Sequence, residues 1–428
     1  ALVALALALG AIALNRVLVG SRLGLRCMAI RDDEPAARAA GVAAARIKVT
    51  AFVVSAAVAS VGGVLYVWNV GYIDPTSAFS GTRELQVVLM VLVGGIGSMW
   101  GPLYGAVLIA LIGEVLWARF PLEQQIVLGS ITVLTAVLMP GGIAAMLQAR
   151  GKLKRAIVWA PPPAAASAAA PVRAVARPAG EHVLATEHLM KRYGGVTAVD
   201  DVDVTIAASE IVGIIGPNGA GKSTLFDVVT GFTPATSGTV RFRGTTITGR
   251  RADQIARAGI ARTFQTSRLF ATLTIWENVL VAAASVNRDR AAACAEARRV
   301  LAQVGLLDGW DQLPATLAPG RQRLLEIARA LALRPQVLLL DESMAGMTPD
   351  EIAQVHAALR AAVAGGCSIV TIEHVLPAIA TLADRVYVLD FGKIIASGPP
   401  LRVFRDPIVL DAYIGVGTSA LDEVAAGA

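Results

Sequence analysis

A loop that could bind phosphate is the strongest chemical feature of the sequence, and it matches the pattern G-x-x-x-x-G-K-[ST]. Its residues are Gly216, Pro217, Asn218, Gly219, Ala220, Gly221, Lys222, Ser223 and Thr224. The glycines allow backbone N–H groups to curl around a β-phosphate, the lysine can reach the β- and γ-phosphate oxygens, and the serine hydroxyl can complete a Mg²⁺ shell at a helix N-terminus. Because an apolar strand expected at Ile211–Ile215 ends directly before the loop, we assign all nine residues to nucleotide binding.

Two carboxylates follow another apolar segment, Gln336–Leu340, and they add catalytic chemistry to the loop. Asp341 suits a role in holding Mg²⁺ through water, and Glu342 suits polarising the attacking water. A buried strand that ends in a capping Asp is the alternative, and the presence of the phosphate loop in the same chain makes it the weaker one. We therefore predict Asp341 as a cofactor and metal residue and Glu342 as a catalytic residue.

A third motif lies between these two, where residues 317–323 read Leu-Ala-Pro-Gly-Arg-Gln-Arg. It resembles the signature of ABC ATPases, a family in which the following helix presents its N-terminus to the γ-phosphate bound by the opposite subunit. Three single residues extend the resemblance: Gln265 to the Q-loop glutamine, His374 to the switch histidine and Tyr193 to the aromatic residue that stacks on adenine. A lone Tyr, Gln or His is usually ordinary surface or core, so it is the order of the five elements that identifies the ABC family.

The resemblance implies ATP and Mg²⁺ as cofactors. It also implies catalytic roles for Glu342, His374 and Gln265, and Mg²⁺ ligands from Ser223, Gln265 and Asp341. The signature residues that would act on the opposite subunit's nucleotide are Ala318, Pro319, Gly320, Arg321 and Gln322.

The signature departs from the usual Leu-Ser-Gly-Gly-Gln spelling of the family. Ala318 stands for the Ser, Pro319 for a Gly or Tyr, and Arg321 for the Gln, so a hydroxyl donor to the γ-phosphate is missing. Thr348 likewise stands where the D-loop normally carries Asp or Asn. We therefore expect an asymmetric ATPase dimer, in which the partner's nucleotide, facing Ala318, turns over more slowly, with partial compensation from the Arg321 cation.

The composition of the chain indicates that the part before the ATPase motifs lies in a membrane. Hydrophobic residues make up 55% of the 428 positions and charged residues only 16%, and the mean hydropathy is +0.61. The excess lies in four nearly charge-free stretches, Ala1–Asn15, Val49–Ile73, Leu85–Gly113 and Gln124–Ala149. A span needs about 20 apolar residues, so the second and fourth qualify as single spans and the first is short.

The third stretch is interrupted by Gly94-Gly95-Ile96-Gly97-Ser98-Met99-Trp100-Gly101-Pro102. If the basic loop at Gly20–Lys48 and the ATPase are both cytoplasmic, this stretch must return to its starting side, as two short helices or a re-entrant hairpin. A glycine-packed helix pair without a role in the transport pathway is the alternative.

The net charge of +6 follows the membrane segments and does not indicate nucleic acid. Basic residues gather beside apolar stretches, at Arg16, Arg22, Arg26 and Arg31 and again in residues 150–155, as the positive-inside rule predicts. The three cysteines, Cys27, Cys294 and Cys367, lack the spacing of a zinc site or a disulfide framework, so we expect buried or inert thiols.

These features predict an α-helical transmembrane domain (partial) at residues 1–149, an Ala/Pro-rich linker at 150–181 and an α/β P-loop ABC ATPase domain at 182–428. The strands expected in the last part are Val183–Ala185, Ile211–Ile215, Gln336–Leu340, Ser368–Ile372 and Arg385–Leu389, in a mainly parallel sheet. Because the chain begins at Ala1 inside an apolar run without Met, we expect a fragment with further spans upstream.

Both halves resemble one type of ABC transporter. Residues 29–42 look like the cytoplasmic coupling segment of importer permeases, with Pro35 interrupting the E-A-A spelling, and Ala36–Ala40 would pack near Gln265. A polar loop between spans is the alternative. Together with the glycine-rich break, this segment resembles the C-terminal portion of the permease of branched-chain amino acid importers, and Arg262–Gln265, Leu273–Val279 and Asp411–Gly415 resemble that system's ATP-binding subunit.

The resemblance implies a fused permease and ATPase subunit in the bacterial inner membrane. Its partners would be a second ABC ATPase, a second permease, an extracytoplasmic solute-binding protein and membrane lipid, without nucleic acid. Related importers carry amides, urea or aromatic acids, and no residue here identifies the substrate. An exporter half-transporter, an ABC ATPase acting on DNA or ribosomes, and a truncated, inactive chain remain as alternatives.

Overall fold

The computed structural model describes residues 2–72, 74, 81–98, 100–119, 124–138, 141–149, 159, 182–342, 344, 347–373 and 376–413. Contacts divide the chain into two compact units. One unit contains residues 1–24 and 49–158, and the other contains residues 25–48 and 159–428. Each unit is considered by itself. The contacts thus group residues 25–48, which the sequence places within the transmembrane part, with the ATPase part.

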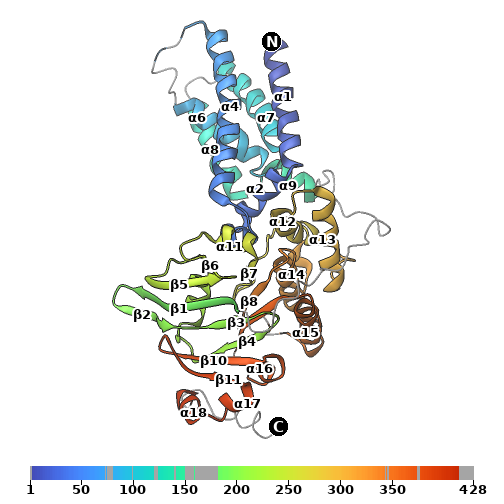
Figure 1. Ribbon diagram of the computed structural model, residues 1–428. Helices are drawn as coiled ribbons and strands as arrows, with labels where there is room; N and C mark the ends of the chain where they lie inside the picture. The colour runs from blue at the N-terminus through green and yellow to red at the C-terminus, as the bar shows by residue number, and fades with distance from the viewer. Residues whose placement is uncertain are drawn as a thin grey trace. The chain divides into compact units, whose positions relative to one another are not determined.

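The central sheet of the second unit is mainly parallel, as expected (Figure 1). In the described part of the chain, its strands follow the order β11-β10-β4-β9-β8-β7, and only β10–β11 is antiparallel. Their bounds are Ile211–Ile215 (β4), Ile260–Arg262 (β7), Val337–Asp341 (β8), Ser368–Ile372 (β9), Arg385–Asp390 (β10) and Lys393–Gly398 (β11). Strands β4, β8 and β9 are buried along their whole length, and most of their residues are apolar for that reason.

A second, antiparallel sheet forms from the strands that precede and follow β4. Its bounds are His182–Tyr193 (β1), Val196–Val202 (β2), Thr205–Ala207 (β3), Ser237–Phe242 (β5) and Thr245–Thr246 (β6). The sequence predicts only a short strand at Val183–Ala185 here, because these strands mix buried and exposed positions without a regular period and carry polar residues. Apolar residues of both sheets and of the helix after the phosphate loop share one core.

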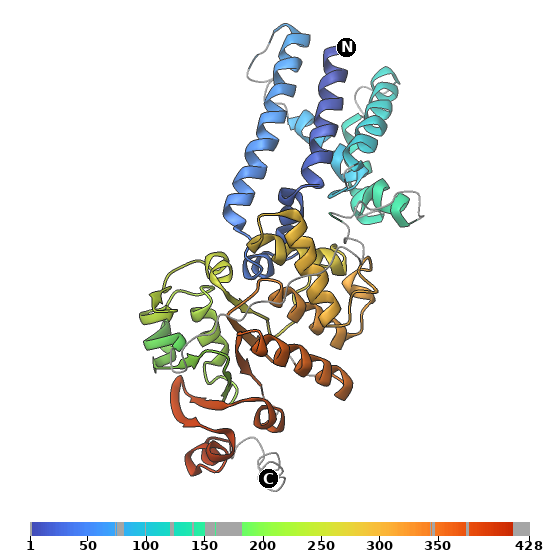
Figure 2. The ribbon, with the colours of Figure 1, turned by 45° about the vertical axis from the view of Figure 1, so that its right-hand side comes forward.

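Helices complete the second unit. Their bounds are Lys222–Val229 (α10), Ala252–Ala258 (α11), Ile275–Val286 (α12), Arg290–Gln303 (α13), Pro319–Leu331 (α14), Pro349–Ala364 (α15), Leu376–Leu382 (α16), Pro400–Val403 (α17) and Pro407–Tyr413 (α18), with a 3₁₀ turn at Pro314–Thr316 (η2). Helices α12–α14 and the antiparallel strands lie on opposite sides of this unit in both views (Figure 2). Helix α12 starts at a capping box in which Thr274 and Glu277 satisfy each other's backbone N–H groups.

The segment expected to couple the two halves folds as two short helices, α2 (Arg22–Asp32) and α3 (Glu34–Ala39). Pro35 lies in the first turn of α3, where a proline costs no hydrogen bond, and the Asp33 carboxylate caps the helix by accepting from Ala36 N at 2.7 Å. Ala36, Ala37, Ala39 and Ala40 are buried. Helix α3 packs on α11, so these alanines lie against the ATPase part, whereas their predicted position near Gln265 stays a prediction.

The first unit consists of apolar helices, namely α1 (Leu2–Val19), α4 (Ala44–Val70), α6 (Gly81–Gly94), α7 (Gly101–Arg119), α8 (Gln124–Leu138) and α9 (Gly142–Ala149). Among the described residues, two helices are long and apolar enough to cross a membrane, α1 and α4. The expectation of one span at Gln124–Ala149 is wrong, because this stretch is divided into α8 and α9, with Gly142 at φ +65° starting the second helix.

The glycine-rich interruption separates α6 from α7, as the sequence predicts. The two helices approach so closely that a Cβ on Gly94 would overlap the Gly101 carbonyl, and one on Gly105 would overlap the Met90 carbonyl. Gly142 of α9 lies equally close to the backbone of Gly95. These glycines therefore pack a helix pair tightly, whatever part the pair plays in transport.

Most of the expected linker lies outside the described residues. Trp159 is described, and its carbonyl accepts a 2.6 Å hydrogen bond from the Trp276 indole of α12. The Arg290 guanidinium lies 5.1 Å from the Trp159 ring centroid.

Candidate nucleotide site

The phosphate loop connects β4 to α10 through glycines with positive φ. Gly216, Gly219 and Gly221 have φ of 152°, 82° and 103°, values that residues with a side chain rarely adopt. Two of these glycines also lack room for a side chain, because a Cβ on Gly216 would overlap the Leu389 carbonyl and a Cβ on Gly221 would overlap the Ala198 carbonyl. The loop is thus fixed by its backbone against β10 and β2.

Lys222 is the first residue of α10 and is buried. Its ammonium donates to the carbonyl oxygens of Gly216 at 2.7 Å and Pro217 at 2.8 Å. Burial lowers the pKa of the ammonium, and the charges of Glu342 and Asp341 oppose that shift. The next residue, Ser223, is exposed. The structure therefore brings the predicted lysine and both predicted carboxylates into one electrostatic cluster.

Asp341 ends β8 with a buried side chain. Its Oδ1 is buried without a hydrogen-bond partner among the described residues, and its Oδ2 lies 3.6 Å from an Arg262 nitrogen. Burial raises the pKa of this carboxyl to about 6, with Arg262 opposing and Glu342 adding to the shift. A buried carboxylate oxygen with no partner is the donor that a hard cation such as Mg²⁺ prefers, so these residues fit the metal.

Glu342 follows β8 in a left-handed conformation, with φ of 47°. Its backbone N–H donates to Ile372 O at 2.9 Å, and its carboxylate Oε2 accepts from Gln265 Nε2 at 2.9 Å. Glutamates rarely adopt this backbone region, and such strain often accompanies a functional position. The hydrogen bond joins two of the three residues that the sequence predicts as catalytic.

The third, His374, lies outside the described residues, as do Ser343, Ala345 and Gly346. Its neighbour Glu373 is buried and accepts from Met344 N at 3.2 Å. The role of His374 stays a prediction.

The helix after the signature, α14, holds Gln265 in place. The Arg323 guanidinium donates to the Phe264 carbonyl at 2.7 Å and also to the Gln265 carbonyl. The buried Glu326 carboxylate accepts from Phe264 N at 3.1 Å and from Arg323 at 3.1 Å. The signature helix and the glutamine that contacts Glu342 are thus mechanically joined.

The predicted signature residues lie at the N-terminus of α14. Ala318 is its N-cap, without a side-chain hydrogen bond to the helix, and Pro319 occupies the first turn. A Cβ on Gly320 would overlap the Glu351 carboxylate. Arg321 donates to Gly305 O at 2.9 Å and Gln322 donates to Leu317 O at 3.0 Å. The Arg321 guanidinium is therefore engaged by a carbonyl of its own chain, and this contact does not favour binding of a phosphate on another subunit.

Tyr193 ends β1 and is 48% exposed, so its ring is open to stacking. The Lys191 ammonium lies 4.7 Å from the ring centroid. A groove of about 670 Å³ adjoins the phosphate loop. Its lining includes Pro217–Ala220, Phe391, Ile408 and Asp411.

Sequence reasoning missed the buried ion pairs behind the site. Arg262 contacts Asp341 and also lies 2.6 Å from the Asp227 carboxylate of α10. Arg262 does belong to the segment that resembles the ATP-binding subunit, but nothing in the sequence alone assigns a partner to it. Its 35-position separation from Asp227 makes this contact a property of the fold.

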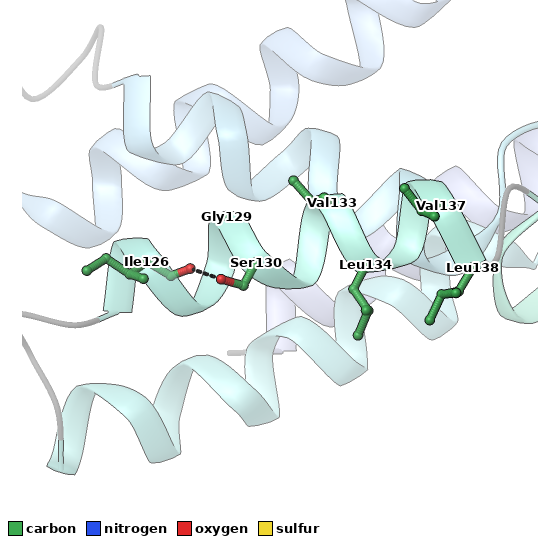
Figure 3. A pocket seen from close by; sticks show the side chains of 7 residues that line it. All are labelled: Ile126, Gly129, Ser130, Val133, Leu134, Val137 and Leu138. Carbon is green, nitrogen blue, oxygen red and sulfur yellow. Dashed lines mark hydrogen bonds between the residues drawn. The ribbon is translucent and has the colours of Figure 1, made fainter.

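A shallow surface depression of about 570 Å³ lies along α8 in the first unit, and most of its lining residues are exposed. Figure 3 shows its lining, which is apolar apart from Ser130, whose hydroxyl donates to Ile126 O at 2.8 Å. The lining residues are Ile126, Gly129, Ser130, Val133, Leu134, Val137 and Leu138. Since the hydroxyl is used within the helix, this face offers van der Waals contact and little polar recognition.

Comparisons with known families and relatives agree with this geometry. Residues 199–345 match the ABC transporter family, and residues 1–139 match the branched-chain amino acid transport system permease component family. The permease match is N-terminal to the ATPase match. Over 251 residues the chain is 38% identical to the high-affinity branched-chain amino acid transport ATP-binding protein LivG of Escherichia coli K12, covering 54% of this chain and 98% of LivG. It is 36% identical to BraF of Pseudomonas aeruginosa, also a high-affinity branched-chain amino acid transport ATP-binding protein. This match covers 54% of this chain and 98% of BraF.

Solved structures show the same fold in the second unit. The ADP conformation of MJ1267, an ATP-binding cassette of an ABC transporter, superposes with a TM-score of 0.51 at 31% identity, covering 55% of this chain and 99% of that one. A nucleotide-free ATP-binding cassette from an ABC transporter gives the same score and identity. The second unit is therefore an ATP-binding domain that hydrolyses ATP, and the apolar helices of the first unit associate with a membrane. The chain belongs to the ABC transporter family, as a fusion of a permease-family segment with an ABC ATPase.

Proposed function

We propose that this chain is the fused permease and ATPase subunit of an importer that uses ATP to carry branched-chain or other hydrophobic amino acids across the cytoplasmic membrane. The supporting observation is that one chain combines a permease-family segment with an ATPase whose relatives LivG and BraF serve branched-chain amino acid transport. Segment 25–48 supports the coupling of the two, because it is buried against the ATPase part. Related solutes such as amides, urea or aromatic acids form the second substrate class.

The roles of the site residues follow from their positions. Residues 216–224 would hold the phosphates, Tyr193 would stack on adenine, and the amide of Gln265 and the carboxylate of Glu342 would flank the γ-phosphate. Ser223, Gln265 and Asp341 would hold Mg²⁺, which, when bound, neutralises charge on the β- and γ-phosphates. Glu342 would then orient and deprotonate the attacking water, and His374 would sense the γ-phosphate.

The exposed signature suggests the assembly. Ala318 and Pro319 are exposed at the N-terminus of a 13-residue helix, where they can face a nucleotide on another subunit. We infer a second ABC ATPase as that partner, together with a second permease and an extracytoplasmic solute-binding protein. The chain would be a multi-pass protein of the inner membrane, with residues 1–149 corresponding to the C-terminal portion of a permease, 150–181 as a linker and 182–428 as the ATPase.

Uptake of radiolabelled leucine by the complete transporter, reconstituted in lipid vesicles with its binding protein, tests this proposal. Glu342→Gln should reduce both uptake and ATP hydrolysis by about 10²- to 10⁴-fold and leave ATP binding intact, because the amide cannot accept a proton. Asp350→Asn, a matched acid-to-amide change at an exposed position of α15, should leave both rates near the wild type. Leucine uptake that persists in Glu342→Gln refutes the proposal, and efflux from the vesicles would identify an exporter.

A further inference from the structure

Arg262 is a buried cation that joins the two motifs of the nucleotide site. It ends β7, and its side chain is 4% exposed. One terminal nitrogen donates to Asp227 at 2.6 Å and Thr230 at 3.0 Å on the phosphate-loop helix and its C-cap, and the other lies 3.6 Å from Asp341 on β8. Its Nε donates to Thr263 O at 3.3 Å. One planar group therefore fixes the spacing between α10 and the carboxylate proposed to hold Mg²⁺.

Two aromatic rings enclose the same guanidinium. Its carbon lies 5.2 Å from the Phe232 ring centroid and 4.7 Å from the Phe264 ring centroid. The rings also contact each other edge to face, with centroids 5.6 Å apart at 84°. A cation is attracted to an aromatic face, and more strongly when it is desolvated. Arg262 and the two rings therefore form a stack that tends to move as one body.

A second arginine lies near each ring. Arg38 of α3 lies 5.3 Å from the Phe232 centroid, and Arg268 lies 5.2 Å from the Phe264 centroid. Arg268 in turn pairs with the α3 capping residue Asp33 at 3.3 Å. Both ends of the stack thus lead to the same short helix, which belongs to the segment between the apolar helices α1 and α4.

We propose that Arg262 is a positioning residue that transmits displacement of α3 to the nucleotide site, through the stack Arg38–Phe232–Arg262–Phe264–Arg268. A shift of α3 displaces Arg38 and, through Asp33, Arg268. Because the stack is close-packed, Arg262 follows, and its shared ion pairs move Asp341 relative to Asp227. A lysine cannot replace this group, since it lacks the planar fork that contacts two carboxylates and two rings at once. Phe264 also adjoins Gln265, so the same displacement reaches the hydrogen bond to Glu342.

The outer end of the stack is tested with the complete transporter in vesicles, by the ratio of solute transported to ATP hydrolysed. Arg38→Met keeps most of the aliphatic stem and removes the cation, and it should lower that ratio by about fivefold or more while ATP hydrolysis in detergent stays within about twofold of the wild type. Arg38→Lys should restore part of the ratio. Lys48→Met is the matched control, because Lys48 is a cation of the same segment that pairs with Glu34 and contacts no ring of the stack. Equal ratios in Arg38→Met and Lys48→Met overturn the proposal.

The inner end is tested without any turnover, in the Glu342→Gln background. The readout is the Mg²⁺ concentration that gives half of the thermal stabilisation by ATP. Arg262→Lys should raise this concentration about tenfold or more, because Asp341 is no longer held in register with α10. Arg262→Lys weakens two buried ion pairs and can therefore prevent folding. In that case Phe232→Leu decides the test, and it should raise the half-saturating Mg²⁺ concentration by about threefold or more. An unchanged Mg²⁺ requirement in the folded variants overturns the proposal.

The coupling ratio rests on the proposed function, whereas the Mg²⁺ requirement does not. A wild-type complex that imports no amino acid in the vesicle assay would refute the proposed substrate class alone. In that case the Mg²⁺ measurement still decides whether Arg262 positions Asp341.

Discussion

Gln265 donates a 2.9 Å hydrogen bond from Nε2 to Oε2 of Glu342. The two residues follow neighbouring parallel strands, β7 and β8, whose carboxyl ends meet at one edge of the sheet. Arg323 of the signature helix donates a hydrogen bond to the backbone carbonyl of Gln265. The proposed water-activating carboxylate is therefore oriented by a residue that the signature helix positions.

Replacing Gln265 by a second acid should disturb this pair through charge. In Gln265→Glu, two carboxylates would lie about a hydrogen bond apart, and like charges at that distance favour sharing one proton. We expect the acid limb of the kcat profile to move to higher pH by about one unit or more. Gln265→Leu removes a hydrogen bond that stabilises the ionised carboxylate but adds no charge, so it should lower kcat and move that limb to higher pH by a smaller amount than Gln265→Glu. Identical pH profiles for the two variants would contradict this role of the pair.

The altered signature predicts unequal turnover at the two nucleotide sites. Ala318 caps α14 without a side-chain hydrogen bond. Ala318→Ser supplies a hydroxyl at this N-cap, which should stabilise the helix by about 1 kcal/mol and raise turnover of the partner's nucleotide. Each site is isolated by mutating the catalytic glutamate of the other, and ATP hydrolysis is measured in both arrangements. Equal rates of ATP hydrolysis at the two sites of the wild type would contradict the expected asymmetry.

Two glycines of the phosphate loop separate backbone strain from steric overlap. Gly219 and Gly221 both have positive φ, but only Gly221 lacks room for a Cβ, which would overlap the Ala198 carbonyl. Gly219→Ala should cost about 1–2 kcal/mol of stability from the backbone conformation alone. Gly221→Ala should cost more and abolish ATP binding, as measured by thermal unfolding and by titration with a fluorescent ATP analogue. If Gly221→Ala and Gly219→Ala bind ATP with equal affinity, the loop backbone can shift enough to make room for the Cβ, which would contradict this prediction.

Cys367 should resist thiol reagents in the folded protein. It is buried, and burial raises the pKa of its thiol to about 12. At pH 8 the thiolate fraction would be roughly 10⁻⁴, against about a quarter for an ordinary thiol of pKa about 8.5. Mass spectrometry after maleimide treatment should find Cys367 unmodified in the native protein and modified after unfolding in denaturant. Rapid native labelling would mean that β9 opens locally.

Sequence patterns predicted much of the ATPase core because its signals are local. The apolar run before Gly216 and the shorter one before Asp341 form buried parallel strands that end at the site. The break between α6 and α7 was likewise visible, since glycines at 94, 95, 97 and 101 interrupt an apolar stretch. The antiparallel strands β2, β3, β5 and β6 were not predicted, because their half-buried, polar-rich pattern also suits loops. The stretch at 124–149 was misread for a related reason, since hydropathy measures length and cannot tell one span from two packed helices.

The sequence by itself determined which chemistry is present: a loop whose glycines and lysine suit phosphate, and a strand-end pair, Asp341 and Glu342, that suits Mg²⁺ and water. Such motifs are legible because each depends on residues a few positions apart and on backbone conformations that few residue types adopt. Only the tertiary structure decided what surrounds that chemistry. It placed Arg262 between Asp227 and Asp341, and it paired Asp33 with Arg268, 235 positions away. Charge pairs and ring contacts of this kind depend on which surfaces the packed core brings together, and no local pattern records that.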